Sequence, residues 1–454
     1  MLYDFIITDK KLKKPMYQQI YLSIRQAIED GSLKKGDKLP SIRGLSNDRG
    51  ISKTTVTGAY DQLCVEGYIE SRPQRGYFVA AEISKLPQKT DTAESGEKKS
   101  RYYAYDFSGK SIDESIIDLA EWRKNVKDIV NRSYLLTSYG DVQGEEALRE
   151  ALHKYALGTR SVNANAQNIV VGAGSQALLY LLCSLFGFGK TIAVEQAAFV
   201  QAEAVFRSFD YDVKYFEQDA YGVTIDSLKE LSPEIVLINP NFSGSRGDSM
   251  PVNRRLEIIK WARQNNALIL EDDYNGELRY RTLPIPCVQH YDVDNTVYIG
   301  SFSKVLLPSV RLSYTVLPEL LMNRFNKVRH LMNQTASKTE QLALANYINY
   351  GKIDVHLRKA RRVYLEKSKT LIAAVERYFP NTDYGFNETA LYLTLPLPES
   401  ADKKIIEEAL ERESVRLMPY DREKNRIALS FSGIAQEKLE EGVRILSKVI
   451  SEHK

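Results

Sequence analysis

Residues 298–314 read Y-I-G-S-F-S-K-V-L-L-P-S-V-R-L-S-Y. The apolar run that leads into this stretch, T-V-Y-I at 296–299, is typical of a strand buried on both faces of a sheet. The run stops at Gly300, two serines flank a phenylalanine, and then Lys304 and Arg311 follow. Ligands of α/β sheets bind beyond the carboxyl ends of such strands. The stretch therefore predicts an α/β fold with a reactive lysine at the end of a buried strand.

Four further apolar runs alternate with longer helical patterns, which predicts a mostly parallel central sheet. They are residues 169–171, 191–194, 235–238 and 268–270. The first run leads into G-A-G-S (172–175), a glycine-rich turn that opens an apolar helix and whose N–H groups suit a phosphate. The last run leads into E-D-D-Y (271–274), which puts carboxylates at a strand end.

These groups together suit pyridoxal 5′-phosphate. A lysine can form a Schiff base with its aldehyde, and a carboxylate can keep the pyridine nitrogen protonated. An arginine matches the phosphate oxygens with its planar fork. Each motif alone has a simpler explanation, as a polar loop, a solvated helix start or an ordinary turn. Their order on successive strand ends favours the cofactor.

The first eighty residues predict a winged helix-turn-helix. Apolar periodicity, serine caps and glycine stops indicate three helices, and two short alternating runs indicate a hairpin. The helices are expected at 16–31, 41–50 and 52–67, and the strands at 68–71 and 76–79. Two short helices joined through a glycine turn have helix-turn-helix spacing, and the hairpin would be the wing.

The domain organisation follows from these changes of pattern. We expect a helix-turn-helix domain at 1–80, a flexible polar linker at 81–104 and an α/β domain at 105–454. The α/β domain should divide into a large part at about 160–345 and a small part at about 346–454.

Composition narrows the class of protein. The chain has 454 residues and a net charge of +3, and residues 1–80 hold 13 Lys and Arg against 9 Asp and Glu, which weakly supports a nucleic-acid contact. No apolar run is long enough to span a bilayer and no secretory segment begins the chain, so we expect a cytoplasmic protein. The three cysteines and five histidines have no metal-site spacing, and we expect no metal.

The chain resembles the MocR/GabR subfamily of GntR regulators. The resemblance rests on D-D-Y at 272–274, S-F-S-K at 301–304 and P-S-V-R-L-S-Y at 308–314, together with L-P-S-I-R-G-L at 39–45 and the S-K-T-T-V-T-G-A-Y-D-Q-L run from Ser52. It implies a winged helix-turn-helix fused to a fold type I aminotransferase-like domain, with a large mostly parallel sheet and a small C-terminal α/β subdomain. That domain would sense a ligand through pyridoxal phosphate, and the protein would be a head-to-tail homodimer on promoter DNA.

The resemblance also implies roles for single residues. Lys304 would form the Schiff base and Asp272 would hold the pyridinium, with Asp273 as a structural neighbour. The other implied cofactor contacts are Gly174, Ser175, Ser301, Ser303 and Arg311 at the phosphate, Phe199 and Tyr274 at the ring, and Tyr139 at the phosphate of the neighbouring subunit. Arg426 would bind an effector carboxylate. An ordinary core position for Phe199, a surface position for Tyr139 and an exposed strand arginine for Arg426 remain open.

One loop departs from the subfamily pattern. After the strand ending near Ile238 the chain reads N-P-N-F-S-G-S-R-G (239–247), where a His-Gln…Pro-Thr/Ser-Gly loop is usual. Asn239, Asn241 or Ser243 could contact the ring oxygen, or none of them.

On the DNA side, the resemblance implies base contacts from the start of the second helix of the motif and backbone contacts around it. The implied residues are Arg43, Lys53, Thr54, Thr55, Gln74, Arg75 and Gly76. Two functions stay open: a transcriptional regulator that senses an amino compound or pyridoxal phosphate itself, and a working aminotransferase that carries a DNA-binding domain. The intact N-terminal unit favours the regulator, with at most a weak or partial aminotransferase reaction.

Overall fold

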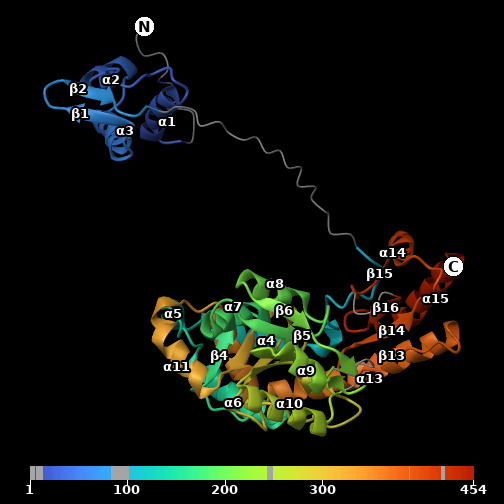
Figure 1. Cartoon of the computed structure of the whole chain (residues 1–454). Coiled ribbons are helices and arrows are strands. Elements are labelled where there is room, and N and C mark those ends of the chain that lie inside the picture. The colour runs from blue at the N-terminus through green and yellow to red at the C-terminus, as the bar shows by residue number, and fades with distance from the viewer. Residues whose placement is uncertain are drawn as a thin grey trace. The chain divides into compact units, whose positions relative to one another are not determined.

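The computed structural model describes residue 6 and residues 14–82, 102–242, 249–387, 389–420 and 425–453. The chain divides into two compact units, Met1–Lys99 and Ser100–Lys454 (Figure 1). No helix among the described residues combines the length and apolar character needed to cross a membrane.

The N-terminal unit is a winged helix-turn-helix, as predicted. Its elements are α1 (Met16–Glu29), α2 (Ile42–Arg49), α3 (Lys53–Val65), β1 (Ile69–Arg72) and β2 (Gly76–Val79). Ser41 and Ser52 are the helix N-caps, because their Oγ atoms accept hydrogen bonds from the N–H groups of Gly44 and Thr55. Gly50 ends α2 in the left-handed conformation, with φ of 60°. The serine and glycine signals in the sequence thus fix the turn between the two helices.

A seven-stranded sheet forms the centre of the C-terminal unit, in the order β4-β12-β11-β10-β9-β5-β6. Its strands are β4 (Ile169–Gly172), β5 (Thr191–Val194), β6 (Asp212–Tyr215), β9 (Ile235–Ile238), β10 (Leu268–Asp273), β11 (Thr296–Ser301) and β12 (Ser313–Val316). β12 pairs antiparallel with both of its neighbours, and the other pairs are parallel. The five apolar runs are all strands, as predicted. β6 and β12 contain polar residues and are not continuous apolar runs, so the sequence analysis did not predict these two strands.

Helices cover both faces of this sheet. Along β9, Ile235 and Leu237 enter one core while Val236 and Ile238 enter the other, which explains the continuous apolar run. The helices around the sheet are α4 (Leu119–Val130), α5 (Ser133–Leu136), α6 (Glu146–Arg160), α7 (Ser175–Phe186), α8 (Val200–Ser208), α9 (Ile225–Leu231), α10 (Val252–Asn265), α11 (Glu319–Val328) and α12 (Lys338–Asn349), with a small hairpin of β7 (Gln218–Asp219) and β8 (Gly222–Val223).

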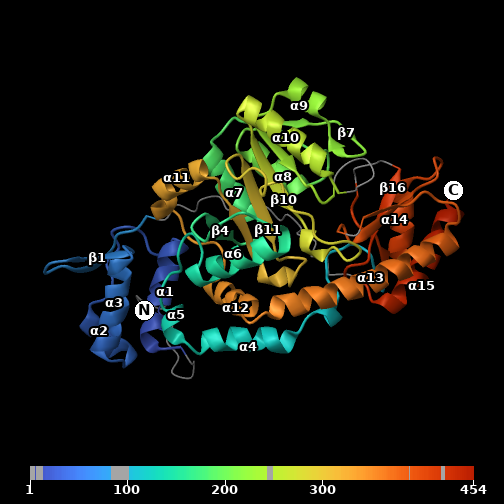
Figure 2. The same cartoon turned by 90° about the horizontal axis from the view of Figure 1, so that it is seen from below.

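A smaller group of strands and helices, here called the C-terminal subdomain, follows the long helix α13 (Lys352–Tyr378), which Figure 2 shows running from the large sheet to it. Its antiparallel sheet has the order β13-β14-β16. The remaining elements are β13 (Gly385–Asn387), β14 (Tyr392–Pro396), α14 (Lys403–Arg412), β15 (Val415–Arg416), β16 (Arg426–Ser430) and α15 (Gln436–Glu452). β15 pairs in parallel with β3 (Tyr105–Asp106), near the start of the same unit.

Candidate functional site

An anion-binding corner lies at the N-terminus of α7. Gly174 has φ of 90°, and a Cβ on this residue would lie 2.5 Å from Nη2 of Arg311. The arginine therefore packs directly against the glycine, which only a residue without a side chain allows. Ser175 is the first residue of α7, where helix N–H groups are free to bind an anion. The structure thus brings Gly174 and Arg311 together, the glycine and the arginine that the sequence analysis assigned to phosphate binding.

Serine hydroxyls complete this corner. Ser303 Oγ accepts from Nη1 of Arg311 at 3.4 Å, and Ser301 Oγ donates to Ser303 Oγ at 3.3 Å. Ser313 on β12, which the sequence did not single out, donates to Ser301 at 3.0 Å. A guanidinium, three hydroxyls and a helix N-terminus form a site that suits a phosphate group.

Asp272 lines an open cavity at the ends of β5, β9 and β10. The lining residues are Val194, Glu195, Ala198, Phe199, Glu203, Leu237, Ile238, Asn239 and Asp272. No described residue forms a hydrogen bond to the Asp272 carboxylate. Burial, with the carboxylates of Asp273 and Glu271, raises the pKa of Asp272 to about 7. A cationic N–H donor in the cavity would relieve this cost and hold Asp272 ionised.

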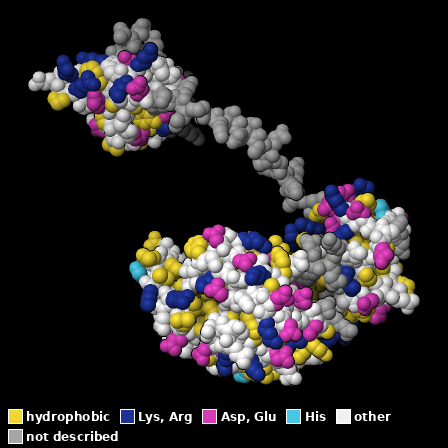
Figure 3. Space-filling model, viewed as in Figure 1, with side chains coloured by type: hydrophobic (Ala, Val, Ile, Leu, Met, Phe, Trp, Pro, Cys, Tyr) yellow, Lys and Arg dark blue, Asp and Glu magenta, His cyan; other side chains and the backbone are white. Residues whose placement is uncertain are grey.

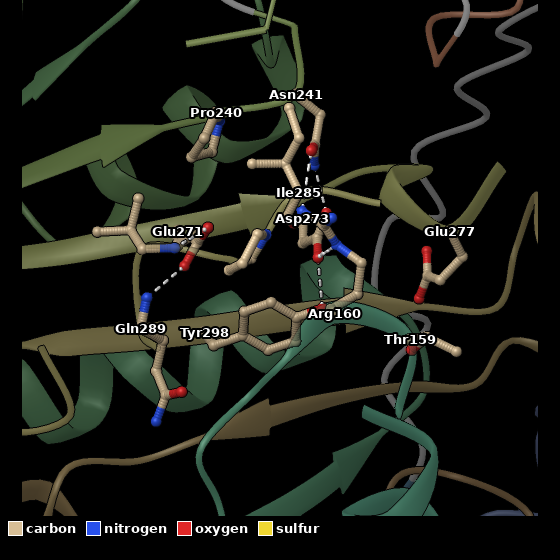
Figure 4. Close-up of polar contacts among 12 residues, drawn as sticks. Thr159, Arg160, Pro240, Asn241, Glu271, Asp273, Glu277, Ile285, Gln289 and Tyr298 are labelled. Atoms are coloured by element: carbon tan, nitrogen blue, oxygen red, sulfur yellow. Dashed lines mark hydrogen bonds and ion pairs between the residues drawn. The ribbon is translucent and has the colours of Figure 1, made fainter. Parts of the chain in front are cut away.

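Asp273 serves the opposite face of the sheet, because successive strand residues point in opposite directions. Its Oδ2 accepts from Nε of Arg160 at 2.6 Å and from the Tyr298 hydroxyl at 2.6 Å, and its Oδ1 accepts from Nδ2 of Asn241. The side chains of Arg160 and Asp273 are both fully buried. Figure 4 shows this group beside Glu271, which accepts the N–H groups of Val288 and Gln289. The D-D pair thus divides into a cavity carboxylate and a structural one.

The same geometry separates the candidates for the ring oxygen. Asn239 lines the cavity with Asp272. Asn241 is fully buried, and its side chain is held between Asp273 and Arg160, whose Nη2 donates to Asn241 Oδ1 at 2.9 Å. Ser243 lies outside the described residues. Of the two asparagines, Asn239 is therefore the one that the structure places at the cavity.

The two predicted ring contacts are placed differently. Phe199 lines the same cavity as Asp272, at the start of α8. Tyr274 follows Asp273 directly and is 38% exposed, outside the cavity lining. Glu195 and Glu203 also line the cavity, and neither was singled out from the sequence because each reads as an ordinary helix or loop carboxylate.

Lys304 lies in the turn after β11, and its ammonium contacts a segment far away in the sequence. Nζ donates to the carbonyls of Gly109 and Ser111, the latter at 3.2 Å, and to Ser432 Oγ at 3.3 Å. Burial lowers the pKa of Lys304 to about 8, although Asp106 opposes the shift. These three partners have no motif of their own, so sequence analysis missed them.

Two predicted residues are not brought to this site. Tyr139 is 101% exposed, which agrees with a role outside its own subunit without testing it. Arg426 begins β16, and its Nη2 donates to the carbonyls of Asp383 at 2.9 Å and Thr394 at 3.3 Å. Its guanidinium is thus held by backbone at the end of β16 remote from Lys304.

The predicted DNA-binding residues lie at the start of α3 and around it. The exposed ones are Arg43, Lys53, Thr54, Gln74 and Arg75. Thr55 is half-buried, and its hydroxyl shares a hydrogen bond of 2.7 Å with the Ser52 cap. Gly76 opens β2 with φ of 103°, which lets the wing turn tightly. Figure 3 shows Lys and Arg side chains on the visible face of this unit, interspersed with Asp and Glu.

Comparison with known proteins agrees with both units. Residues 16–79 match the family "Bacterial regulatory proteins, gntR family", and residues 108–446 match "Aminotransferase class I and II". A relative in Bacillus subtilis, the uncharacterized HTH-type transcriptional regulator YdeL, is 32% identical, with 96% of this chain and 97% of that protein covered. The probable rhizopine catabolism regulatory protein MocR of Rhizobium meliloti is 26% identical, with coverage of 97% and 95%.

Among solved structures, the multiple substrate aminotransferase of Thermococcus profundus superposes with a TM-score of 0.70. It is 24% identical and covers 82% of this chain and 98% of its own, which shows the fold of the C-terminal unit. The chain therefore belongs to the MocR/GabR subfamily of GntR transcriptional regulators, in which a DNA-binding helix-turn-helix is joined to an aminotransferase class I and II domain.

Proposed function

We propose that this regulator binds pyridoxal 5′-phosphate in its C-terminal unit and changes its promoter binding in response to a small amine. Members of the aminotransferase class I and II family bind this cofactor. When bound, the cofactor supplies an aldehyde carbon that a primary amine can attack, with the Lys304 amine as the group displaced. The observation that carries the proposal is the Asp272 carboxylate, which faces an open cavity and has no hydrogen-bonding partner among the described residues.

The residues present fit the cofactor. The anion corner at Gly174, Ser303 and Arg311 would hold its phosphate, and a side chain at 174 would displace the arginine. Asp272 would keep the pyridine nitrogen protonated, and Phe199 would pack on the ring. Lys304, with its pKa lowered to about 8, would hold a useful fraction of neutral amine near neutral pH.

Adjacent aspartates provide the first test. Asp272→Asn should weaken cofactor binding about tenfold or more, because the amide cannot form a charge-assisted bond to the ring nitrogen. It should not harm the fold of the cofactor-free protein. Asp273→Asn should instead destabilise the fold by about 3–5 kcal/mol, because it leaves the buried Arg160 charge uncompensated.

Cofactor titration and thermal unfolding of both variants measure these effects, and pH gives a further check. The Asp272 pKa is raised to about 7 from an unfolded value of about 3.9, so cofactor-free wild type should lose stability relative to Asp272→Asn as pH rises through that window. Equal cofactor affinity in wild type and Asp272→Asn would remove Asp272 from the site.

The pH dependence of cofactor attachment tests Lys304. Because only the neutral amine attacks, the rate should rise about tenfold per pH unit below about 8 and level off above it. The rate of the visible absorbance change after mixing cofactor with cofactor-free protein measures this. Nα-acetyllysine under the same conditions corrects for ionisation of the cofactor itself, and Lys304→Ala should show no attachment that survives borohydride reduction. A rate that keeps rising to about pH 10 would contradict the lowered pKa.

DNA binding should depend on the exposed cations of the N-terminal unit. Lys53→Ala and Arg75→Ala should each weaken binding to duplex DNA, and should reduce the slope of log affinity against log salt by about one where a phosphate contact is lost. Fluorescence anisotropy over a salt series measures this. Lys229→Ala is the matched control, since Lys229 is an exposed lysine of the other unit, paired with Asp226. An unchanged slope in both test variants would exclude these two cations from the interface.

We also propose that the protein is a homodimer through its C-terminal unit. Several large apolar side chains are exposed around one segment, among them Tyr134, Leu136, Tyr139 and Leu331. A second open cavity is lined by residues that include Val142, Phe325 and Met332. Exposed apolar surface of this kind marks an interaction site.

Sedimentation should therefore give twice the chain mass of 51.7 kDa at micromolar concentration. Tyr139→Ala should leave the fold intact and weaken cofactor binding in the dimer if this side chain completes the neighbouring phosphate site. A monomeric mass would contradict the proposal.

A further inference from the structure

A cluster of rings, here called the ring cluster, joins the loop after β9 to the C-terminal subdomain. It consists of Ala390, Tyr392, Tyr420 and Ala428, with Phe242 and Met418 packed against them. The Phe242 and Tyr392 rings pack edge to face with their centroids 5.4 Å apart, and the Tyr392 and Tyr420 rings pack in the same way with centroids 6.2 Å apart. Tyr392 and Tyr420 each keep 8% of their surface exposed, and Phe242 and Met418 are half-buried, so the cluster has an accessible edge.

The ring cluster borders both halves of the proposed cofactor site. Phe242 follows Asn239, which lines the Asp272 cavity, by three residues in the same loop. On the other side, a Cβ on Gly109 would lie 3.9 Å from Sδ of Met418 and 3.0 Å from Oγ of Ser430. Gly109 is the residue whose carbonyl accepts from Lys304. An amine that reached the Lys304 position would therefore have the ring cluster as its neighbour.

Strand β16 places the cluster, and not Arg426, next to Lys304. Residues 426, 428 and 430 share one face of this strand. Ser430 is the end nearest Lys304, because its Oγ donates to Ser432 Oγ at 3.1 Å and Ser432 contacts Lys304. Arg426 lies about 13 Å further along the strand, and its guanidinium is held by the carbonyls of Asp383 and Thr394. The residue between them on that face is Ala428, which is fully buried.

The chemistry of this lining selects the effector. A carboxylate placed against the described lining of rings, a methionine and an alanine would lose its water without gaining a cation from that lining, which costs several kcal/mol. Lys403 is one described cation beside the cluster, and its ammonium donates to the backbone carbonyl of Tyr420. An aromatic or alkyl group would instead pack against the ring edges.

We infer that the effector is a primary amine that carries no carboxylate and whose aromatic or apolar group packs on the ring cluster. The inference rests on the proposed function, since it takes the amine to Lys304 through the bound cofactor. It replaces the carboxylate contact that the sequence suggested for Arg426. Two residues then set the specificity for an amine without a carboxylate. Ala428 provides no charge for a carboxylate, and Tyr392 provides a ring against which an apolar group can pack.

Two matched pairs of probe amines test the inference on the full-length protein loaded with cofactor. 2-Phenylethylamine differs from L-phenylalanine, and pentylamine from 5-aminopentanoate, by one carboxylate. Dissociation constants come from the change in the visible spectrum on titration. The uncharged member of each pair should bind about tenfold or more tightly than its carboxylated partner. The reverse order in both pairs, lost in Arg426→Gln, would overturn the inference.

Variants of the lining supply the second arm. Tyr392→Leu and Tyr420→Leu should weaken 2-phenylethylamine binding by about fivefold or more and leave cofactor attachment unchanged, while Arg426→Gln and Lys403→Gln should alter neither. Ala428→Arg should reverse the order within each pair, a gain that misfolding cannot produce. Unchanged affinity in both tyrosine variants would remove the ring cluster from the effector site.

The proposed function and this inference can fail separately. If borohydride traps no cofactor on Lys304 of the wild type, the proposed function fails first and the inference falls with it. If the cofactor is trapped and none of the four amines alters the spectrum or the affinity for DNA, the proposed cofactor site stands and the inference is overturned.

Discussion

The buried pair of Arg160 and Asp273 is the interaction on which the site depends. It joins the last residue of α6 to the last residue of β10, and both side chains are removed from water. A buried pair of this kind is weak evidence for stability, but removing one partner is costly. The pair also organises its surroundings, because Tyr298 on β11 and Asn241 in the loop after β9 donate hydrogen bonds to the same Asp273 carboxylate. The end of β10, the middle of β11 and the loop after β9 are thereby held in one arrangement beside Asp272.

The pair also reaches the C-terminal subdomain through backbone. The Asn241 carbonyl accepts the hydroxyl of Thr389 at 3.1 Å, and Nδ2 of Asn275 donates to the Thr389 carbonyl at 3.1 Å. Thr389 lies shortly before β14, whose first residue is Tyr392 of the ring cluster.

Burial shifts the pKa values of the two reactive groups, Asp272 and Lys304, in opposite directions. It raises the pKa of Asp272 and lowers that of Lys304, because burial disfavours the charged form of each. Each group is thus moved towards neutral pH by the packing around it.

Much of the fold could be predicted because its signals are local. The parallel strands are buried on both faces and appear as unbroken apolar runs, and Ser41, Ser52 and Gly50 mark helix ends by their own chemistry. The anion corner followed from motif order, since Gly174 and Arg311 both lie at ends of central strands. Family resemblance, rather than spacing, assigned Asp272 and Asp273 their different roles.

What the sequence could not supply depends on contacts between distant segments. The Lys304 ammonium meets Gly109 and Ser111, which precede it by almost two hundred residues and carry no motif. Arg160 on α6 binds the Asn241 side chain, which leaves Asn239 as the asparagine at the cavity, and nothing in the loop sequence indicates this contact. The direction of Arg426 follows from the register of β14 against β16, where Pro396 lies opposite it, and no local pattern encodes that register.

The pairing of β3 with β15 has a mechanical consequence. Phe107 is held between β15 and β16, because its N–H donates to the Arg416 carbonyl at 2.8 Å and its carbonyl accepts from the Ser430 N–H at 3.0 Å. The start of the C-terminal unit is therefore hydrogen-bonded to strands of the C-terminal subdomain. Any change in the position of β15 and β16 would therefore carry residues 105–107 with them, although these residues lie about three hundred positions earlier in the chain.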